Sequence, residues 1–210
     1  MTDPQHRPTT PDDALAELLA GNERFVTGAR IHPHQDAERR AALANAQRPF
    51  AVVFGCSDSR LAAEIIFDRG LGDLFVVRTA GHIVGPEVRA SIEYGITILG
   101  ATLLVVLGHD SCGAIQATHD ALAGRYTPTE ATQVIVDRIR PCLDRAAERG
   151  LTDLDAVSDT HIQMTVDDLA HSALAGAVVA KECVVVGMAY RLEDGRVTVI
   201  ASSDDPQDPK

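Results

Sequence analysis

The segment FAVVFGCSDSR, residues 50–60, begins as an unbroken apolar run and then turns polar within one residue of Gly55. Its polar end carries a thiol, an acid and a base at alternate positions: Cys56, Asp58 and Arg60. A short, continuous aliphatic and aromatic run is typical of a strand that is buried on both faces of a parallel sheet. The segment therefore predicts a buried strand that ends in a cluster of reactive side chains.

Two further segments have the same character. DLFVVRTAG (73–81) and ATLLVVLGH (101–109) are predicted strands, and PEVRASIEYGITILG (86–100) between them has the apolar spacing of a helix. Alternating strands and helices predict an α/β fold with a mostly parallel central sheet flanked by helices. Near the C-terminus, VVVGMAYRL (184–192) and RVTVIA (196–201) predict a hairpin that adds an antiparallel edge strand.

The other helices are expected at 113–124, 129–150 and about 163–181, with a short helix or turn at 61–70. Pro141 is expected to kink or break the second of these helices, because proline has no backbone N–H to donate.

The N-terminal part of the chain predicts one more helix. Thr10 fits the N-cap position and Pro11 the first helical position, and the following residues place their apolar side chains on one face. This helix precedes the first strand by more than 20 residues. We expect residues 1–49 to form a helical arm that packs on a partner subunit, and residues 50–210 to form an α/β domain that contains the strands described above.

Composition excludes some classes of protein. Of the 210 residues, 45% are hydrophobic and 23% charged, as in a globular domain, and the net charge is −11. No basic stripe is present, so a nucleic-acid partner is not expected. The apolar runs are too short to span a membrane and the first 30 residues lack a signal-peptide core, so we expect a cytoplasmic location. Four cysteines are too few for a disulfide framework and instead suggest ligands, nucleophiles or core residues.

A second polar cluster, GHDSC (108–112), follows the predicted strand at 101–109. In open parallel sheets, ligands bind at the carboxyl ends of the strands, so this cluster and CSDSR are expected to meet. Together they offer Cys56, Asp58, His109 and Cys112, a set of ligands that suits tetrahedral Zn²⁺. Taken singly, Cys56 and His109 are more often a packed core thiol and a capped loop, but the combination favours a metal site.

These residues resemble the signature of the β-class carbonic anhydrases of bacterial type. The resemblance rests on C-S-D-S-R at 56–60 followed by H-x-x-C at 109–112, and extends over nearly the whole chain. Further similar segments are LLAGNERF (18–25), FVVRTAG (75–81), SIEYG (91–95), VVLGHDSCGAI (105–115) and GMAYRLEDG (187–195).

The resemblance implies a zinc enzyme, a lyase that hydrates CO₂ reversibly to bicarbonate and a proton. It implies one Zn²⁺ per chain with Cys56, His109 and Cys112 as permanent ligands, and attack on CO₂ by zinc-bound hydroxide. It also implies a homodimer, or a tetramer built from dimers, with active sites near the subunit interface.

Asp58 and Arg60 would form a catalytic dyad in such an enzyme. Two thiolates already cancel the charge of Zn²⁺, and Asp58 as a fourth ligand would close the site to water. The guanidinium of Arg60 can hold a carboxylate through two parallel hydrogen bonds, which would keep Asp58 off the metal. The sequence leaves both the closed and the open arrangement possible.

By resemblance, Phe75, Ala80 and Tyr94 would line an apolar CO₂ pocket, and Gln47 would reach the substrate from across a dimer. Ordinary core packing is the alternative for Phe75 and Tyr94, and a plain loop position is the alternative for Gln47.

The chain departs from the family pattern at two places. Some bacterial members hold a non-catalytic bicarbonate with a Trp, an Arg and a Tyr; Arg78 and Tyr190 match, but Val53 stands where the Trp would be, so this site is expected to be absent or altered. His82 stands where asparagine is common. It is interpreted as a partly exposed loop histidine, with a proton relay as the alternative.

The sequence is also compatible with three other functions. The same scaffold could hydrolyse CS₂ or COS. A site closed by Asp58 would make a non-catalytic zinc-binding protein, against which the intact Asp58–Arg60 pair argues. A metal-free enzyme could instead use Cys56 or Cys112 as a nucleophile with His109 as its base.

Overall fold

A single five-stranded sheet forms the centre of the molecule in the computed structural model, which describes residues 7–171, 174–180 and 182–204. The strands lie in the order β2-β1-β3-β4-β5. Their bounds are β1 Ala51–Cys56, β2 Leu74–Thr79, β3 Leu103–His109, β4 Val184–Tyr190 and β5 Val197–Ser202. β1 to β4 pair in parallel and β5 pairs antiparallel with β4, which confirms the predicted mostly parallel sheet with an antiparallel edge.

The two central strands have no exposed face. Every residue of β1 and of β3 is buried, which is why both read as continuous apolar runs. Successive side chains point to opposite faces, so Val53 packs in one core cluster and its neighbours Val52 and Phe54 pack in the other.

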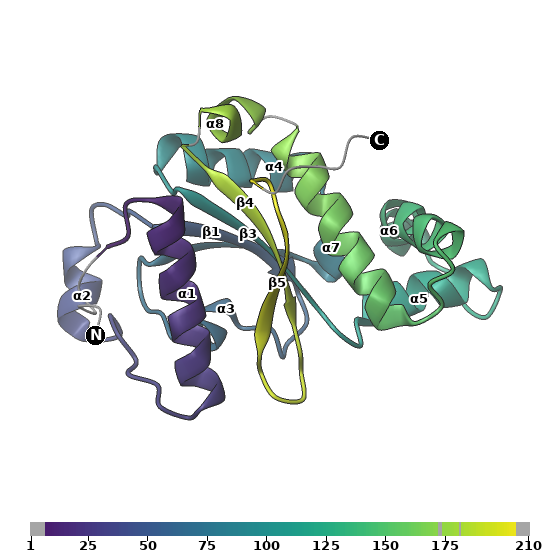
Figure 1. Cartoon of the computed structure of the whole chain (residues 1–210), viewed down its shortest axis with the longest axis horizontal. Coiled ribbons are helices and arrows are strands. Elements are labelled where there is room, and N and C mark those ends of the chain that lie inside the picture. The colour runs from purple at the N-terminus through teal and green to yellow at the C-terminus, as the bar shows by residue number, and fades with distance from the viewer. Residues whose placement is uncertain (1–6, 172–173, 181, 205–210) are drawn as a thin grey trace.

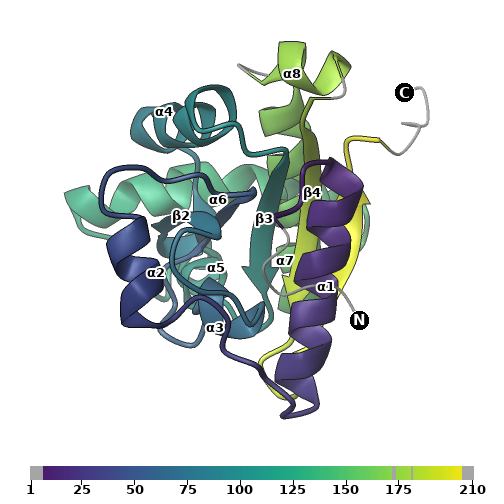
Figure 2. The same ribbon diagram turned by 90° about the vertical axis from the view of Figure 1, so that its left-hand side faces the viewer.

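Helices cover both faces of this sheet (Figures 1 and 2). Residues of α1, α3, α5 and α6 join the core cluster on one face, and residues of α4 and of much of α7 join the cluster on the other. The paired helices α5 and α6 project to the right in Figure 1. The bounds are α1 Pro11–Val26, α2 Ala37–Ala42, α3 Ala63–Ile66, α4 Pro86–Glu93, α5 Gly113–Leu122, α6 Glu130–Glu148, α7 Leu154–Ala170 and α8 Ala175–Val179.

Helix α1 packs against its own chain. Ala14 and Leu18 are fully buried in the core, and the Asn22 amide donates to the carbonyl of Gly195 at 2.8 Å and accepts from the N–H of Val197 at 2.9 Å. The helix is thus attached to the β4–β5 hairpin. The division into an arm and a catalytic domain, and a contact between the arm and a partner subunit, stay predictions.

Two predicted helix boundaries are wrong. The helix expected at about 163–181 begins already at Leu154 and ends at Ala170, where a short separate helix, α8, follows. The predicted break at Pro141 does not occur, because α6 is continuous from Glu130 to Glu148, and the alternative, a kink at Pro141, stays a prediction. Pro141 lies on the exposed side of α6, where water can satisfy the carbonyl that lacks its helical donor.

The register brings the two polar clusters together. Gly55 pairs with Leu107, so the parallel strands β1 and β3 end side by side, with Cys56 and His109 at the same edge of the sheet. No helix in the described part of the chain has both the length and the apolar composition needed to cross a membrane.

Candidate metal centre and active site

Three side chains converge where β1 and β3 end. The sulfurs of Cys56 and Cys112 and a ring nitrogen of His109 lie within 4.8 Å of one another, and all three residues are buried. Cys56 ends β1, His109 ends β3, and Cys112 precedes the first residue of α5. Two sulfurs and an imidazole nitrogen at this spacing form a group that could hold a metal ion.

The orientation of His109 supports this assignment. Its Nδ1 lies 2.7 Å from the carbonyl oxygen of Asp110, an arrangement in which Nδ1 carries the hydrogen. Its Nε2 is buried and has no hydrogen-bond partner among the described residues. A buried polar atom without a partner is costly, and a metal ion at this position would satisfy it.

The thiols of Cys56 and Cys112 shift each other's pKa in opposite directions. Hydrogen bonding with Cys112 lowers the pKa of Cys56, with help from His109 and the N–H of Gly81 and against the effect of burial. Hydrogen bonding to Cys56, together with burial, raises the pKa of Cys112. Burial lowers the pKa of His109, but its interactions with the Cys56 sulfur outweigh burial and raise it. The cluster thus holds negative charge on sulfur, as a cation site requires.

Asp58 faces Arg60. The guanidinium donates from Nε to Oδ1 at 2.9 Å and from Nη2 to Oδ2 at 2.7 Å, and the backbone N–H of Arg60 donates to Oδ1 at 2.9 Å. These bonds, the side-chain ones foremost, hold the pKa of Asp58 well below its usual range. Oδ2 also lies 3.9 Å from Nε2 of His109, so the carboxylate stands beside the ligand cluster.

Arg78 fixes the backbone that carries these groups. Its Nε donates to the carbonyl of Cys56 at 2.9 Å and its Nη2 to the carbonyl of Asp58 at 2.6 Å. The guanidinium that matches one position of the non-catalytic bicarbonate site is therefore engaged with the main chain. Val53, at the tryptophan position, is buried in the core.

Gly81 links the cluster to helix α7. Its N–H donates to Sγ of Cys56 at 3.3 Å, and its carbonyl lies 2.9 Å from Nε2 of His161. Gly81 has a φ of 66°, and a Cβ there would come within 2.7 Å of the Cβ of Ala114, so only glycine fits. Sequence reasoning missed His161, because no pattern in α7 marks it and its partner lies 80 residues earlier.

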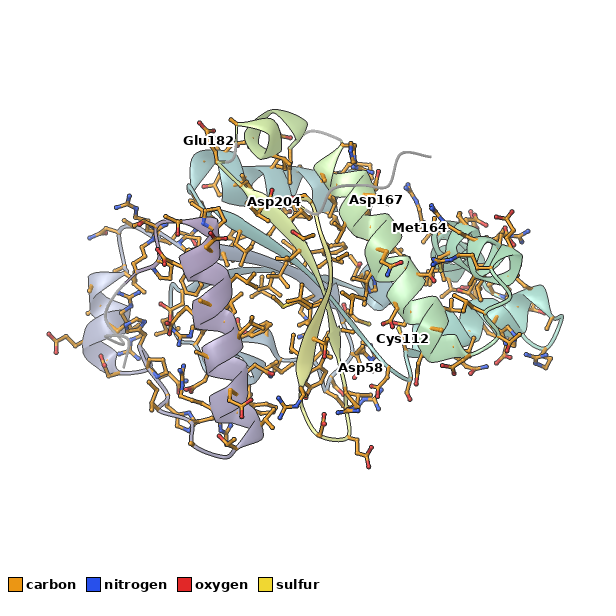
Figure 3. The ribbon with its side chains drawn as sticks, viewed as in Figure 1. Asp58, Cys112, Met164, Asp167, Glu182 and Asp204 are labelled. Atoms are coloured by element: carbon orange, nitrogen blue, oxygen red, sulfur yellow. The ribbon has the colours of Figure 1, made fainter. Side chains whose placement is uncertain are left out.

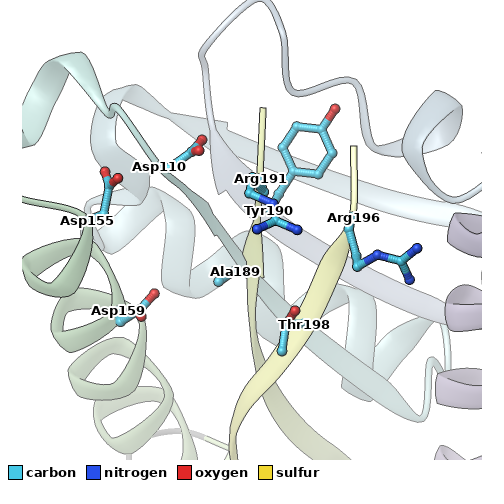
Figure 4. Close-up of a pocket in the computed structure, with 8 residues that line it drawn as sticks. All are labelled: Asp110, Asp155, Asp159, Ala189, Tyr190, Arg191, Arg196 and Thr198. Atoms are coloured by element: carbon cyan, nitrogen blue, oxygen red, sulfur yellow. The ribbon is translucent and has the colours of Figure 1, made fainter. Parts of the chain in front are cut away.

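The loop that carries His109 and Cys112 is also held by α7. The Ser158 hydroxyl donates to the carbonyl of His109 at 2.9 Å, and the N–H of Ser111 donates to Asp155 at 2.9 Å. Asp110 and Asp155 line a surface pocket of about 260 Å³ beside this loop, and Figure 4 shows them on neighbouring elements. The labelled Asp58 and Cys112 mark the same end of the sheet in Figure 3.

The predicted substrate residues fall into two groups. Ala80 follows β2, whose last residue, Thr79, pairs with Cys56, so Ala80 is exposed near the cluster. Gln47 precedes β1 and lines a surface pocket together with Tyr94. The Tyr94 ring lies 6.1 Å from that of Phe75, which pairs with Val52 early in β1. Val52 lies four residues before Cys56, about 13 Å at about 3.3 Å per residue, and this separates the second group from the cluster within one chain.

His82 is not the partly exposed loop histidine that the sequence suggested. It is 1% exposed, its ring centroid lies 4.2 Å from that of His161, and neither ring nitrogen has a partner among the described residues. Burial, followed by the nearby His161 and His109, lowers its pKa well below the ordinary value. Cys142 and Cys183 are buried core thiols, and burial raises the pKa of each to about 12.

Comparison with known sequences agrees with this geometry. The sequence model of the family "Carbonic anhydrase" matches residues 51–197. The chain is 49% identical to a carbonic anhydrase of Mycolicibacterium smegmatis, covering 90% of this chain and 93% of the relative. It is 45% identical to carbonic anhydrase 2 of Mycobacterium tuberculosis, covering 91% and 93%.

Solved structures share the fold. A tetrameric β-carbonic anhydrase of Sordaria macrospora superposes with a TM-score of 0.72 at 21% identity, covering 91% of this chain and 99% of the other. The Coccomyxa β-carbonic anhydrase gives a TM-score of 0.70 at 23% identity, covering 90% and 87%. Because the family model and both close relatives span the strand ends that carry Cys56, His109 and Cys112, this chain belongs to the β class of the carbonic anhydrase family and is an enzyme of that family.

Proposed function

We propose that this chain catalyses the reversible hydration of CO₂ to bicarbonate and a proton, with one Zn²⁺ held by Cys56, His109 and Cys112. The observation that carries the proposal is the buried cluster itself. Two sulfurs and a ring nitrogen of His109 meet within 4.8 Å, and the buried Nε2 of His109 has no hydrogen-bond partner in the part of the chain that the structure describes. A carboxylate that is bonded to Arg60 lies beside them.

The donor set fits zinc in number and kind. Zinc in catalytic sites has three protein ligands of nitrogen, sulfur or oxygen and one open position. Bound there, Zn²⁺ would supply a Lewis acid that lowers the pKa of water from about 16 toward about 7. Cys56 and Cys112 as thiolates would balance the charge of the ion. His109 would bind as a neutral imidazole, because its Nδ1 carries the hydrogen that faces Asp110.

Asp58 and Arg60 are the groups that act on the attacking water. Arg60 holds both carboxylate oxygens, so Asp58 is kept from serving as a fourth metal ligand. The low pKa of Asp58 keeps its carboxylate ionised at neutral pH, so it can only accept hydrogen bonds. By accepting one from the attacking water, Asp58 would turn a lone pair of that water toward CO₂. The dyad would thus decide whether the site is open.

The CO₂ pocket would be completed by a second copy of the chain. Ala80 lies near the cluster in its own chain, whereas Gln47, Phe75 and Tyr94 lie toward the opposite end of β1. Ala80 and the three distant residues can contact the same substrate molecule only if a partner subunit supplies Gln47, Phe75 and Tyr94. We therefore propose a homodimer, or a tetramer of dimers, in which Gln47 hydrogen-bonds substrate across the interface. A cytoplasmic location stays a prediction.

The test combines metal analysis with stopped-flow CO₂ hydration on the full chain at two pH values. We expect about one zinc per chain and fast hydration above neutral pH that disappears when a chelator removes the metal. Full activity in metal-free protein, lost on alkylation of Cys56, would instead establish the cysteine-nucleophile enzyme. Stoichiometric zinc without hydration of CO₂, but with turnover of COS or CS₂, would establish the hydrolase. Zinc without any turnover would establish a non-catalytic zinc protein.

A further inference from the structure

A second polar cavity lies near the opposite end of β1 from the metal cluster. Its volume is about 130 Å³, and it is set against Phe50, just before β1, and Asp73, just before β2. Its lining consists of four arginines, one histidine, one acid and two apolar residues: Arg7, Arg39, Arg48, Arg69, His34, Asp73, Leu43 and Phe50. Four guanidinium groups around one carboxylate are conspicuous in a chain whose net charge is −11.

Two of the four arginines are balanced by acids. Arg69, whose side chain is 3% exposed, pairs with Glu17 at 2.5 Å. Arg39 reaches Asp73 at 3.4 Å, and the same carboxylate also accepts from Nδ1 of His34 at 2.7 Å. Asp73 and Glu17 thus neutralise the positive charges of Arg39 and Arg69.

The other two arginines, Arg7 and Arg48, form no ion pair with an acidic residue that the structure describes. Arg7 donates to the carbonyl oxygens of Arg48 at 3.0 Å and Pro49 at 2.9 Å, and neither guanidinium lies within ion-pair distance of a carboxylate of residues 7–171, 174–180 or 182–204. Burial, and then the positive charge of Arg48, lower the pKa of Arg7. Two like charges are thus held close together by the fold, which costs free energy unless an anion lies between them.

We propose that this cavity binds a phosphate group, with Arg7 and Arg48 as its two charged contacts. A divalent oxyanion matches two guanidinium groups in charge, and guanidinium N–H groups match phosphate oxygens in geometry. The cavity is small, so it takes inorganic phosphate or the terminal phosphate of a small ester. Arg7 already donates hydrogen bonds to the carbonyl oxygens of Arg48 and Pro49. A phosphate bound to Arg7 and Arg48 therefore holds the segment 43–49 against the start of β1.

Within one chain the cavity lies apart from the metal cluster, and its neighbour Gln47 is assigned above to the active site of a partner subunit. Cys56 ends β1, whereas Phe50 precedes it, and in Figure 1 helix α2 and its neighbouring segment lie on the left, away from the end marked by Asp58 and Cys112 in Figure 3. The proposal therefore does not depend on the proposed function, and its test reads binding rather than CO₂ turnover.

The test is calorimetric titration of the zinc-loaded full chain with inorganic phosphate, repeated with methyl phosphate, sulfate and bicarbonate. We expect saturable phosphate binding that weakens at least about tenfold in Arg48→Ala and is lost in Arg48→Glu. The side chain of Arg48 is exposed and makes no hydrogen bond with described residues, so neither variant removes a side-chain hydrogen bond. Arg140→Ala on the exposed face of α6 is the matched control and keeps wild-type affinity. Binding of methyl phosphate would identify a phosphate ester, and its failure the free ion.

A second readout locates the anion. Hydrogen exchange of the amides in 43–49 should slow when phosphate is added to the wild type and should not change in Arg48→Glu. Equal affinities in Arg48→Ala and the wild type would overturn the proposal, because phosphate would then bind at the metal centre or nowhere specific. Binding that weakens equally in Arg140→Ala would also overturn it, because only net charge would matter.

Discussion

At the scale of single residues, the ligand cluster depends on a few contacts that leave each donor atom one orientation. The Asp110 carbonyl fixes the ring of His109, and the Gly81 N–H and the Cys112 thiol stabilise negative charge on Cys56. Ligand atoms that are held in place before the metal arrives cost little to organise when it binds. In the proposed zinc site, the affinity for metal would therefore depend on the residues that hold the three ligands in place as well as on the ligands themselves.

Removal of any one ligand is expected to lower the zinc content. Cys56→Ser, His109→Ala and Cys112→Ser each take away one of the three proposed ligands, so each variant should hold well below one zinc per chain after dialysis. Cys142→Ala is the control, because Cys142 is a buried thiol of α6 outside the cluster, and it should keep its zinc. Atomic absorption measures the zinc content of each variant. Stoichiometric zinc in all three would contradict the assignment of Cys56, His109 and Cys112 as zinc ligands.

His161 is expected to act as a positioning residue. His161→Ala frees the Gly81 carbonyl and thereby loosens the N–H that donates to Cys56, so zinc should bind about 10- to 100-fold more weakly. His161→Gln keeps a donor and should restore part of the affinity, whereas His171→Ala at the exposed end of α7 should have no effect. Competition with a chromophoric chelator measures this. Unchanged affinity in His161→Ala would assign the residue to packing alone.

At the scale of elements, the chain attaches its helices to the sheet with buried polar contacts. Asp68, after α3, is 2% exposed and accepts from Nε of Arg24 on α1 at 2.7 Å and from the N–H groups of Ile31 and His32. Burial raises the pKa of this carboxyl, but the hydrogen bonds outweigh burial and lower it. One carboxylate therefore holds the end of α1 and the segment that follows it against α3.

Asp68→Asn is expected to destabilise the protein by about 1–3 kcal/mol at pH 7, because the ionised partner of Arg24 is lost. Asparagine tolerates the φ of 46° at this position, so the backbone should not be strained. Since the folded pKa is lowered, the stabilisation is fully present above the unfolded pKa of about 3.9 and is lost as the pH falls from there through the lower, folded pKa. Urea unfolding at pH 7 and near pH 3 measures this; an equal difference between variant and wild type at both would contradict it.

At the scale of the whole molecule, the sequence predicts the sheet and the metal cluster because their signals are local. Apolar runs place β1 and β3, and the shared carboxyl edge of parallel strands brings Cys56 and His109 together. Contacts between residues distant in sequence have no such signal. Helix α7 buries Ser158, Thr160, His161 and Thr165, so the apolar spacing that marks a helix is weak over its first half, and its start at Leu154 was missed. The burial of His82 likewise depends on packing against α7.

The assembly of two chains is expected to be part of the active site. Gln47→Ala and Cys56→Ser should each be inactive alone, yet should regain activity when both chains are co-expressed and form mixed dimers. Only in the mixed dimer does an intact metal cluster face an intact Gln47 of the other subunit. Stopped-flow assays and sedimentation of the mixture test this. A monomer, or a mixed dimer without activity, would show that Gln47 does not act across an interface.

The central claim, that Asp58 acts on the attacking water while Arg60 keeps it from the metal, is tested most directly by Asp58→Asn. The amide has nearly the same shape but is no longer an anion that can only accept hydrogen bonds. We expect the variant to keep about one zinc per chain while its kcat for CO₂ hydration falls about 100-fold or more. Wild-type turnover by a zinc-loaded Asp58→Asn protein would contradict it.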